Sequence, residues 1–176
     1  MKKILFTTLF AAFVLLTAFT LYNSEEWKLT DGYSIRFSGK KANGFFHTLR
    51  GKVNFDENKL STSSVQLEVD VASISMGNSL KTWHAKRPKW FDAKKYPIIS
   101  FVSNKFQKST KGFVVNGKLK MKGLEKDIAV PFSFNHNVFF GQFYVRRSEY
   151  NVGSLKGMSK SVADSIKVEF TIPVTK

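Results

Sequence analysis

The side chains best suited to chemistry in this 176-residue chain are gathered in one short stretch, "KTWHAKRPKWFDAKKYP", residues 81–97. It holds six lysine or arginine residues, one histidine and four aromatic residues. Cationic and aromatic side chains at this spacing suit three kinds of anionic partner, namely nucleic acid, a membrane surface or an acidic ligand. The stretch is therefore either a binding surface for an anionic partner or only the solvated outside of a connection, and the rest of the chain has to indicate which.

Catalytic and metal chemistry find little support elsewhere. The three histidines, His47, His84 and His136, lie in separate segments with no paired ligand spacing, so we expect no metal site. Asp92 and Glu149 are isolated carboxylates beside cations, which favours local ion pairs or caps. There is no cysteine nucleophile, G-x-S-x-G elbow or phosphate-binding glycine loop. The sequence predicts a protein that is not an enzyme and needs no cofactor.

The formal net charge of +15 favours anionic partners. Lys118, Lys120 and Lys122 alternate with apolar residues, so they spread over the outer face of a sheet. A nucleic-acid reader would concentrate its cations in one groove with stacking aromatic rings, so we expect no nucleic acid partner. An anionic membrane surface remains an expected partner.

The first residues have the layout of an export signal. Lys2 and Lys3 precede an uncharged, largely apolar run from Ile4 to Tyr22. This pattern predicts a signal peptide over residues 1–22, with an uncleaved N-terminal anchor as the alternative because the run approaches the length of a membrane span. We therefore expect a periplasmic or secreted protein whose folded domain covers residues 25–176. With no cysteine, neither a disulfide nor a lipid on an N-terminal cysteine is available.

The elements that must position these side chains are strands. Apolar residues alternate with polar ones along most of the chain, as in "VQLEVDVASI" at 65–74, and turn signals separate the runs. One long connection, residues 75–97, is expected to be partly helical and interrupted at Pro88. The sequence predicts an all-β, eight-stranded antiparallel barrel, since closure removes exposed sheet edges. The expected strands are 27–38, 44–55, 64–74, 98–107, 112–122, 126–135, 138–148 and 164–174.

A series of motifs from Trp27 to Lys176 resembles the YceI-like family, also called the lipid or polyisoprenoid-binding family. The most specific is His84 followed by "WFD" at 90–92 and "YPIISFVS" at 96–103. The others are "WKLTDGYSIRFSGKKANGFF" at 27–46, "GKVNFD" at 51–56, "VQLEVDVASISMGN" at 65–78, "GKLKMKGLEKDIAVPF" at 117–132 and "RRSEYNVG" at 146–153.

The resemblance implies a secreted or periplasmic, lipocalin-like barrel that binds rather than catalyses. Its elongated apolar cavity would hold a long-chain amphiphile such as a polyisoprenoid, recognised by length and shape. We expect the mouth near residues 81–97, where His84, Lys86, Arg87 and Lys89 would meet a phosphate or diphosphate head group. The residues expected to enclose the apolar tail are Val69, Val71, Phe101, Leu119, Met121, Phe132, Phe134, Phe143, Phe170 and Ile172.

A second function class stays open. If side chains fill the barrel, the protein would be an envelope stress or interaction module whose basic exterior binds anionic surfaces. The oligomeric state is open as well, with a homodimer among the options. In either case we expect Trp90, Phe91, Asp92, Tyr96 and Pro97 to be structural, seating the connection on the barrel and starting the next strand.

Overall fold

Eleven strands form one antiparallel sheet in the computed structural model, which describes residues 26–176. The predicted signal peptide or anchor at 1–22 lies outside the described residues. The strands are β1 (Glu26–Leu29), β2 (Ser34–Ser38), β3 (Gly44–Phe46), β4 (Leu49–Asn54), β5 (Ser64–Asp70), β6 (Ile74–Ser75), β7 (Ile98–Ser109), β8 (Gly112–Met121), β9 (Leu124–Asn135), β10 (Val138–Arg146) and β11 (Ser165–Thr175). The α-helix α1 (Ser79–Ala85) and the 3-10 turns η1 (Leu60–Thr62), η2 (Val71–Ser73), η3 (Arg147–Tyr150) and η4 (Gly157–Ser161) lie in the connections.

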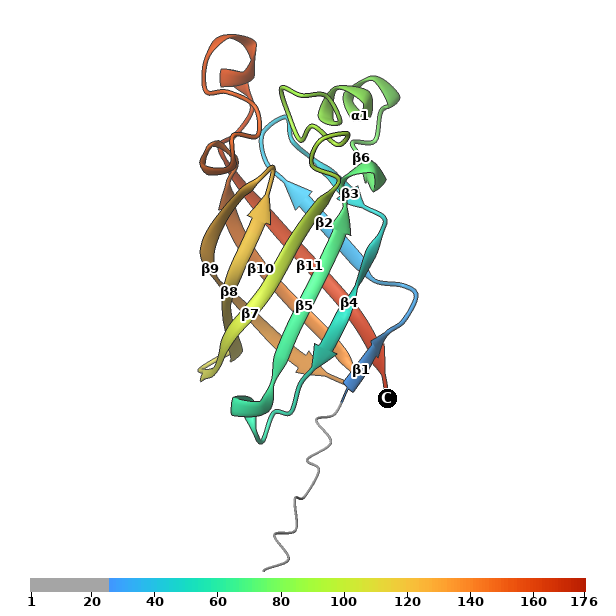
Figure 1. The fold of residues 1–176 in the computed structure, drawn as a ribbon, viewed down its shortest axis with the longest axis vertical. Coiled ribbons are helices and arrows are strands. Elements are labelled where there is room, and N and C mark those ends of the chain that lie inside the picture. The colour runs from blue at the N-terminus through green and yellow to red at the C-terminus, as the bar shows by residue number, and fades with distance from the viewer. Residues whose placement is uncertain (1–25) are drawn as a thin grey trace, which may run out of the picture.

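The sheet closes on itself because β1 pairs with both β4 and β11. The closed ring runs β1, β4, β5, β7, β8, β9, β10, β11, and β2, β3 and β6 extend it beyond β11 (Figure 1). This confirms the predicted eight-stranded antiparallel barrel. Each of the first three predicted strands is split, into β1 and β2, β3 and β4, and β5 and β6. A closed barrel of eight tilted strands has an interior just wide enough to be filled by side chains or to hold one small ligand.

Local polar bonds explain one of these splits. The Asp70 side chain caps η2 by accepting a hydrogen bond of 2.7 Å from the Ala72 N–H. The Ser73 hydroxyl donates to the Asp70 carbonyl and accepts from the N–H groups of His47 and Thr48, both at 3.1 Å. Serine and aspartate compete in this way with regular pairing, so the strand stops at Asp70 although the apolar alternation continues.

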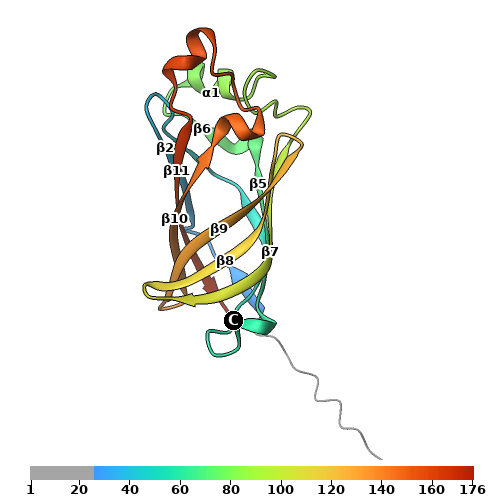
Figure 2. The same ribbon diagram turned by 90° about the vertical axis from the view of Figure 1, so that its left-hand side faces the viewer.

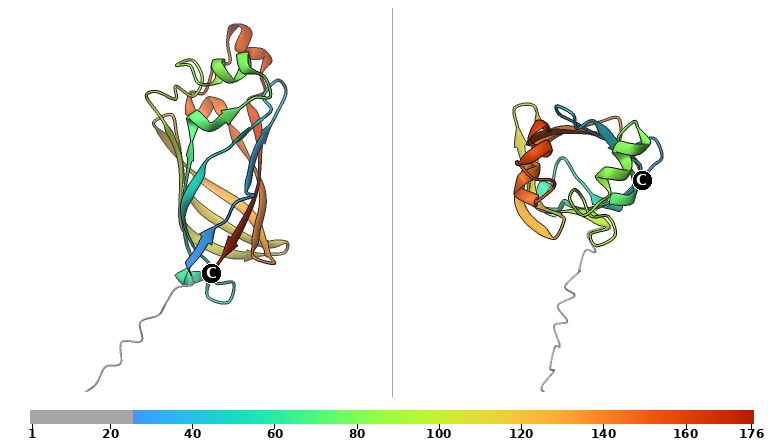
Figure 3. Two further views of the ribbon diagram at one scale, coloured as in Figure 1. Left: turned by 90° about the vertical axis from the view of Figure 1, so that its right-hand side faces the viewer. Right: turned by 90° about the horizontal axis from the view of Figure 1, so that it is seen from above.

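The two ends of the barrel differ, as Figures 1 and 2 show. At the end we call the helix end lie α1, the rest of connection 76–97, and the loop 147–164. At the opposite end, which we call the terminal end, β1 begins and β11 finishes beside the loop 55–63 (Figure 3). Among residues 26–176 no helix combines the length and apolar character that crossing a bilayer requires.

Aromatic rings close the terminal end from inside. Phe55, only 2% exposed, lies at the centre. Its ring contacts five others at centroid distances of 5.2 to 6.0 Å, mostly edge to face, the geometry that aromatic quadrupoles favour. The five are Phe106, Phe113, Phe132, Phe134 and Phe139. The barrel is therefore packed solid at its terminal end.

Candidate ligand cavity

Between the packed terminal end and the helix end lies a cavity of about 180 Å³. Every residue that lines it is apolar. Eight of the ten residues expected to face inward do line it, and they are Val69, Phe101, Leu119, Met121, Phe132, Phe143, Phe170 and Ile172. An apolar space of this kind offers water no hydrogen-bond partners, so it favours an apolar occupant.

The structure places the other two predicted residues outside the cavity. Val71 lies in η2, where the strand pattern has ended, and is 1% exposed in a cluster with Tyr150 and Val152. Phe134 belongs to the terminal cluster, with its ring 4.4 Å from that of Phe139 and 5.3 Å from that of Trp27. Neither residue lines the cavity, because alternation gives the face of a residue but not its depth along the barrel.

Sequence reasoning also missed lining residues that carry the same signal. They lie on the inner face of strands whose alternation was already recognised, such as 64–74 and 126–135. The additional lining residues are Ile35, Phe46, Leu49, Val53, Val65, Leu67, Ile99, Phe106, Val115, Ile128, Val130, Phe139, Val145 and Val168.

Comparison with known proteins identifies this architecture. The family model for the YceI-like domain matches residues 27–174. The chain belongs to the YceI-like family. The resemblance seen in the motifs is thereby confirmed over nearly the whole described chain.

Relatives of this YceI-like chain include UPF0312 proteins. One from Pseudomonas putida is 30% identical over 113 residues, covering 62% of this chain and 55% of the relative. One from Photorhabdus laumondii is 27% identical over 85 residues, covering 48% and 44%. The chain thus aligns with about half the length of the curated relatives it matches.

Solved structures share the fold. BcnA of Burkholderia cenocepacia is 28% identical with a TM-score of 0.78, and the match covers 85% of this chain and 100% of BcnA. The YCEI protein of Campylobacter jejuni is 20% identical with a TM-score of 0.65, covering 79% and 86%. A polyisoprenoid binding domain from Saccharophagus degradans is 12% identical with a TM-score of 0.55, covering 85% and 92%. The last two, at such low identity, are similar in fold alone.

In this YceI-like barrel, two glycines hold large rings against the wall of the cavity. A Cβ atom at Gly117 would lie 2.6 Å from the ring of Phe101, and one at Gly141 would lie closer still to the ring of Phe170. Real Cβ atoms do not approach so closely, so each ring lies flat on a backbone that has no side chain. The glycines thereby leave space in the middle of the barrel.

Replacing Gly117 by Ala is expected to strain the contact with β7, because the new Cβ would meet both the Val102 carbonyl oxygen and the Phe101 ring. Overpacking of this kind should lower the free energy of unfolding by about 1–3 kcal/mol, measured by urea denaturation. Lys120→Ala is the matched control, on the exposed face of the same strand, and should change stability by less than about 0.5 kcal/mol. A Gly117→Ala protein as stable as the parent would contradict the tight contact.

The connection at the helix end packs onto the barrel through the family motif. The Phe91 ring meets Phe46 edge to face at 5.8 Å, and the Arg147 guanidinium lies 5.5 Å from the Trp90 ring. The Asp92 carbonyl accepts from the Tyr96 N–H at 2.8 Å, and the Pro97 carbonyl accepts from the Val71 N–H at 2.8 Å. These contacts agree with the structural role expected for residues 90–97.

Lys122 ties this connection to the neighbouring loop. Its ammonium group donates to the carbonyls of Pro88 at 2.9 Å, Lys89 at 3.4 Å and Asn151 at 2.7 Å. Burial lowers the pKa of Lys122, and the nearby Asp92 charge opposes that shift. The bonds hold the two segments of the helix end together.

The cations expected at a mouth do not reach the cavity. His84, Arg87 and Lys89 are exposed and Lys86 is partly exposed, and none of the four lines the cavity. The Arg87 guanidinium lies 4.6 Å from the Trp83 ring on the outside. The structure therefore does not place these side chains on the cavity wall, and their role toward a head group stays a prediction.

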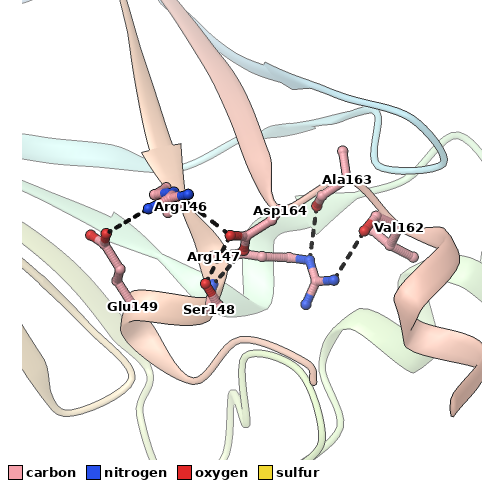
Figure 4. A network of polar contacts seen from close by, with 7 residues as sticks. All are labelled: Arg146, Arg147, Ser148, Glu149, Val162, Ala163 and Asp164. Carbon is pink, nitrogen blue, oxygen red and sulfur yellow. Dashed lines mark hydrogen bonds and ion pairs between the residues drawn. The ribbon is translucent and has the colours of Figure 1, made fainter. Parts of the chain in front are cut away.

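Arg147 organises the loop 147–164 (Figure 4). It is 4% exposed, and its guanidinium donates to five backbone carbonyls at 2.9 to 3.3 Å. The acceptors are Val152, Ser154, Ser159, Val162 and Ala163. All five guanidinium N–H groups are used, so a lysine could not replace this residue.

Asp164 anchors the start of the same loop. Its carboxylate accepts from the Ser148 N–H and from the Ser148 hydroxyl, both at 2.9 Å. Burial favours the neutral acid, but these bonds and the charges of Arg147 and Arg146 outweigh it, so the pKa of Asp164 lies below its usual value. Nearby, burial and the Glu149 charge raise the pKa of Tyr150 to about 12. Among residues 26–176 no group of three His, Cys, Asp or Glu residues could hold a metal ion.

Proposed function

We propose that this YceI-like protein is exported and binds a long-chain amphiphile, an isoprenoid chain in particular, inside its barrel, and that it is not an enzyme. The observation that carries the proposal is the cavity, whose lining is apolar throughout. Burying apolar surface there is favourable by about 25 cal/mol per Å². The similarly folded Saccharophagus degradans domain, described as polyisoprenoid binding, supports the same class of ligand.

The size of the cavity sets a condition on the ligand. At about 180 Å³ it is smaller than the roughly 300–1,000 Å³ of pockets for drug-sized ligands. An apolar cavity of about 150 Å³ admits benzene. A long chain therefore needs more room, which the half-buried side chains of Met121, Phe143 and Phe170 can supply by changing rotamer.

The proposal is tested on protein purified without detergent. We expect native mass spectrometry and solvent extraction to find a long-chain lipid bound, or emptied protein to take up geranylgeraniol at a stoichiometry of one. Protein that is empty and takes up no isoprenoid would overturn the proposal.

The alternative function, binding to anionic surfaces, is favoured by the composition of the helix end. Its loops, 39–43, 76–97, 122–123 and 147–164, contain twelve Lys or Arg residues and three Asp or Glu residues. The terminal end has three Lys or Arg residues and two Asp or Glu residues in its loops, 55–63, 110–111 and 136–137, and at residue 176. Three large apolar side chains are exposed among those cations, Leu80 at 63%, Trp83 at 53% and Leu155 at 50%. Such a surface suits the interface of an anionic bilayer.

Replacing both Leu80 and Trp83 by Ser is expected to weaken sedimentation with phosphatidylglycerol vesicles about tenfold or more, since both side chains would insert among the lipids. Binding of the parent should fall as salt is raised and be absent on phosphatidylcholine alone. Tyr144→Ser, a 63% exposed position on the barrel side, should bind like the parent. Equal loss in both variants would remove the helix end from this role.

A further inference from the structure

The barrel wall has a gap in its backbone pairing between residues 26–38, which form β1 and β2, and residues 44–54, which form β3 and β4. Ladder pairing joins Trp27 to Val53 at one end and Ile35 to Phe46 at the other. Between these pairs, residues 28–34 and 47–52 form no ladder with each other, because β1 turns to β11 and β4 pairs onward with β5. We call this gap the slot.

A tyrosine hydroxyl spans the slot. The Tyr33 Oη donates to the His47 carbonyl at 3.0 Å and accepts from the Leu49 N–H at 3.1 Å. A side chain thus replaces the backbone bonds that would otherwise join the two segments. Side-chain bridges of this kind can open without unpairing a strand.

Two hollow spaces meet at the slot. Outside it is a hollow of about 260 Å³ lined by residues 31–35 and 45–47, and inside it is the apolar cavity. Ile35 and Phe46 line both spaces, and both are only partly buried. The wall is therefore one side chain thick at this place.

The two ends of the barrel are sealed more thoroughly. At the terminal end Phe55 is 2% exposed beneath its five neighbouring rings. At the helix end Val71 is 1% exposed, and Ile74 and Tyr150 are 2% exposed. A chain passing through either end would have to displace a tightly packed cluster, whereas at the slot it meets the partly buried Ile35 and Phe46 and the Tyr33 bridge.

We propose that the apolar chain of the ligand enters through the slot, past the Tyr33 bridge and beside the paired Ile35 and Phe46, and that the outer hollow holds the polar end of the ligand. This inference rests on the proposed function. The polar residues lining the hollow are Asp31, Tyr33, Ser34 and His47, and no Lys or Arg is among them. Arg36 lies over the neighbouring Phe45 ring, 5.6 Å from its centroid. Hydroxyl groups and a carboxylate can form hydrogen bonds with an alcohol. A phosphate would be repelled by the Asp31 carboxylate, because both are negatively charged.

A disulfide across the slot tests the route. Ser34 and His47 are the next positions after the Ile35 and Phe46 pair, and both are exposed. Opposed positions on antiparallel strands suit a disulfide, and the chain has no cysteine of its own. We expect the oxidised Ser34→Cys/His47→Cys protein to take up geranylgeraniol at least about tenfold more slowly than the same protein after reduction, followed by native mass spectrometry at timed intervals.

The control is a second pair, Tyr144→Cys/Lys167→Cys, which joins β10 and β11 where they already pair. Its oxidised and reduced forms should load at equal rates. If the oxidised slot variant loads as fast as its reduced form, the route is overturned while the proposed function stands. If the unmodified protein loads no geranylgeraniol at all, the proposed function fails and the route fails with it.

The head-group assignment has its own measurement. We expect geranylgeraniol to bind the parent protein at least about tenfold more tightly than geranylgeranyl phosphate. Asp31→Asn should reduce this preference by improving phosphate binding, because it removes the like charge. Equal affinity of the parent for alcohol and phosphate would overturn the assignment of the hollow.

Discussion

Arg147→Met is expected to lower the free energy of unfolding by about 3–4 kcal/mol, an exceptionally large effect for one substitution. The substitution removes all five charged donors and leaves the carbonyls of Val152, Ser159 and Val162 in a site from which water is largely excluded. A buried acceptor without a partner costs more than the bond contributed. Guanidinium denaturation would give the change in free energy.

Two further variants make the Arg147 result specific. Arg147→Lys keeps the charge but has only three donors, so about half of the loss, roughly 2 kcal/mol, should remain. Arg146→Met removes a 68% exposed side chain whose ion pairs to Glu149 and Asp164 measure 3.9 and 3.8 Å. Exposed pairs contribute little, so its effect should stay below about 1 kcal/mol. An Arg147→Met protein that unfolds at the parent's denaturant concentration would show that the loop closes without this side chain.

Val69→Phe is expected to weaken binding of geranylgeraniol at least about tenfold, which corresponds to 1.4 kcal/mol or more. Val69 lines the cavity from β5, beside Leu49 and Ile99 on the neighbouring strands. A phenyl ring there occupies the space that the apolar chain would take. The unfolding free energy should change by less than about 1 kcal/mol, because the ring fills empty volume rather than a packed core.

The matched control for Val69→Phe carries the same change on the outside of the barrel. Val102 lies on β7 and is 47% exposed, so Val102→Phe should leave both binding and stability as they are in the parent. Affinity would be measured by native mass spectrometry on protein emptied by solvent extraction. Undiminished binding by Val69→Phe would mean that the ligand lies elsewhere.

The barrel could be predicted because its strands and turns are determined by short patterns that repeat along the sequence. Alternation with period two marks which side chains avoid water, and short turns force neighbouring strands to be antiparallel. This reasoning placed Leu119, Met121 and Phe132 on the wall of the cavity, as the structure has them. What it could not give is depth, so Phe134 was assigned to the cavity although it packs with Trp27 at the terminal end.

The features that distinguish this barrel from an ideal one depend on contacts distant in sequence. The slot exists because residues 28–34 do not pair with residues 47–52, and Tyr33 bonds to a carbonyl 14 residues further along the chain. The alternation of apolar and polar residues along a strand does not predict a hydrogen bond between such distant residues. Likewise, the cations near 81–97 were expected at a mouth, but His84, Arg87 and Lys89 are exposed and none of them lines the cavity. The orientation of α1 depends on tertiary contacts, such as the burial of Ala85 and the packing of Phe91 against Phe46.

The position of the chain termini gives the molecule a direction. β1 begins and β11 finishes at the end opposite α1, with strands of up to 12 residues between the two ends. At about 3.3 Å per residue and a tilt of about 40°, the ends stand roughly 30 Å apart. A tether attached at Glu26 would therefore hold the helix end, with its cationic loops, away from the anchoring surface and toward whatever lies across from it.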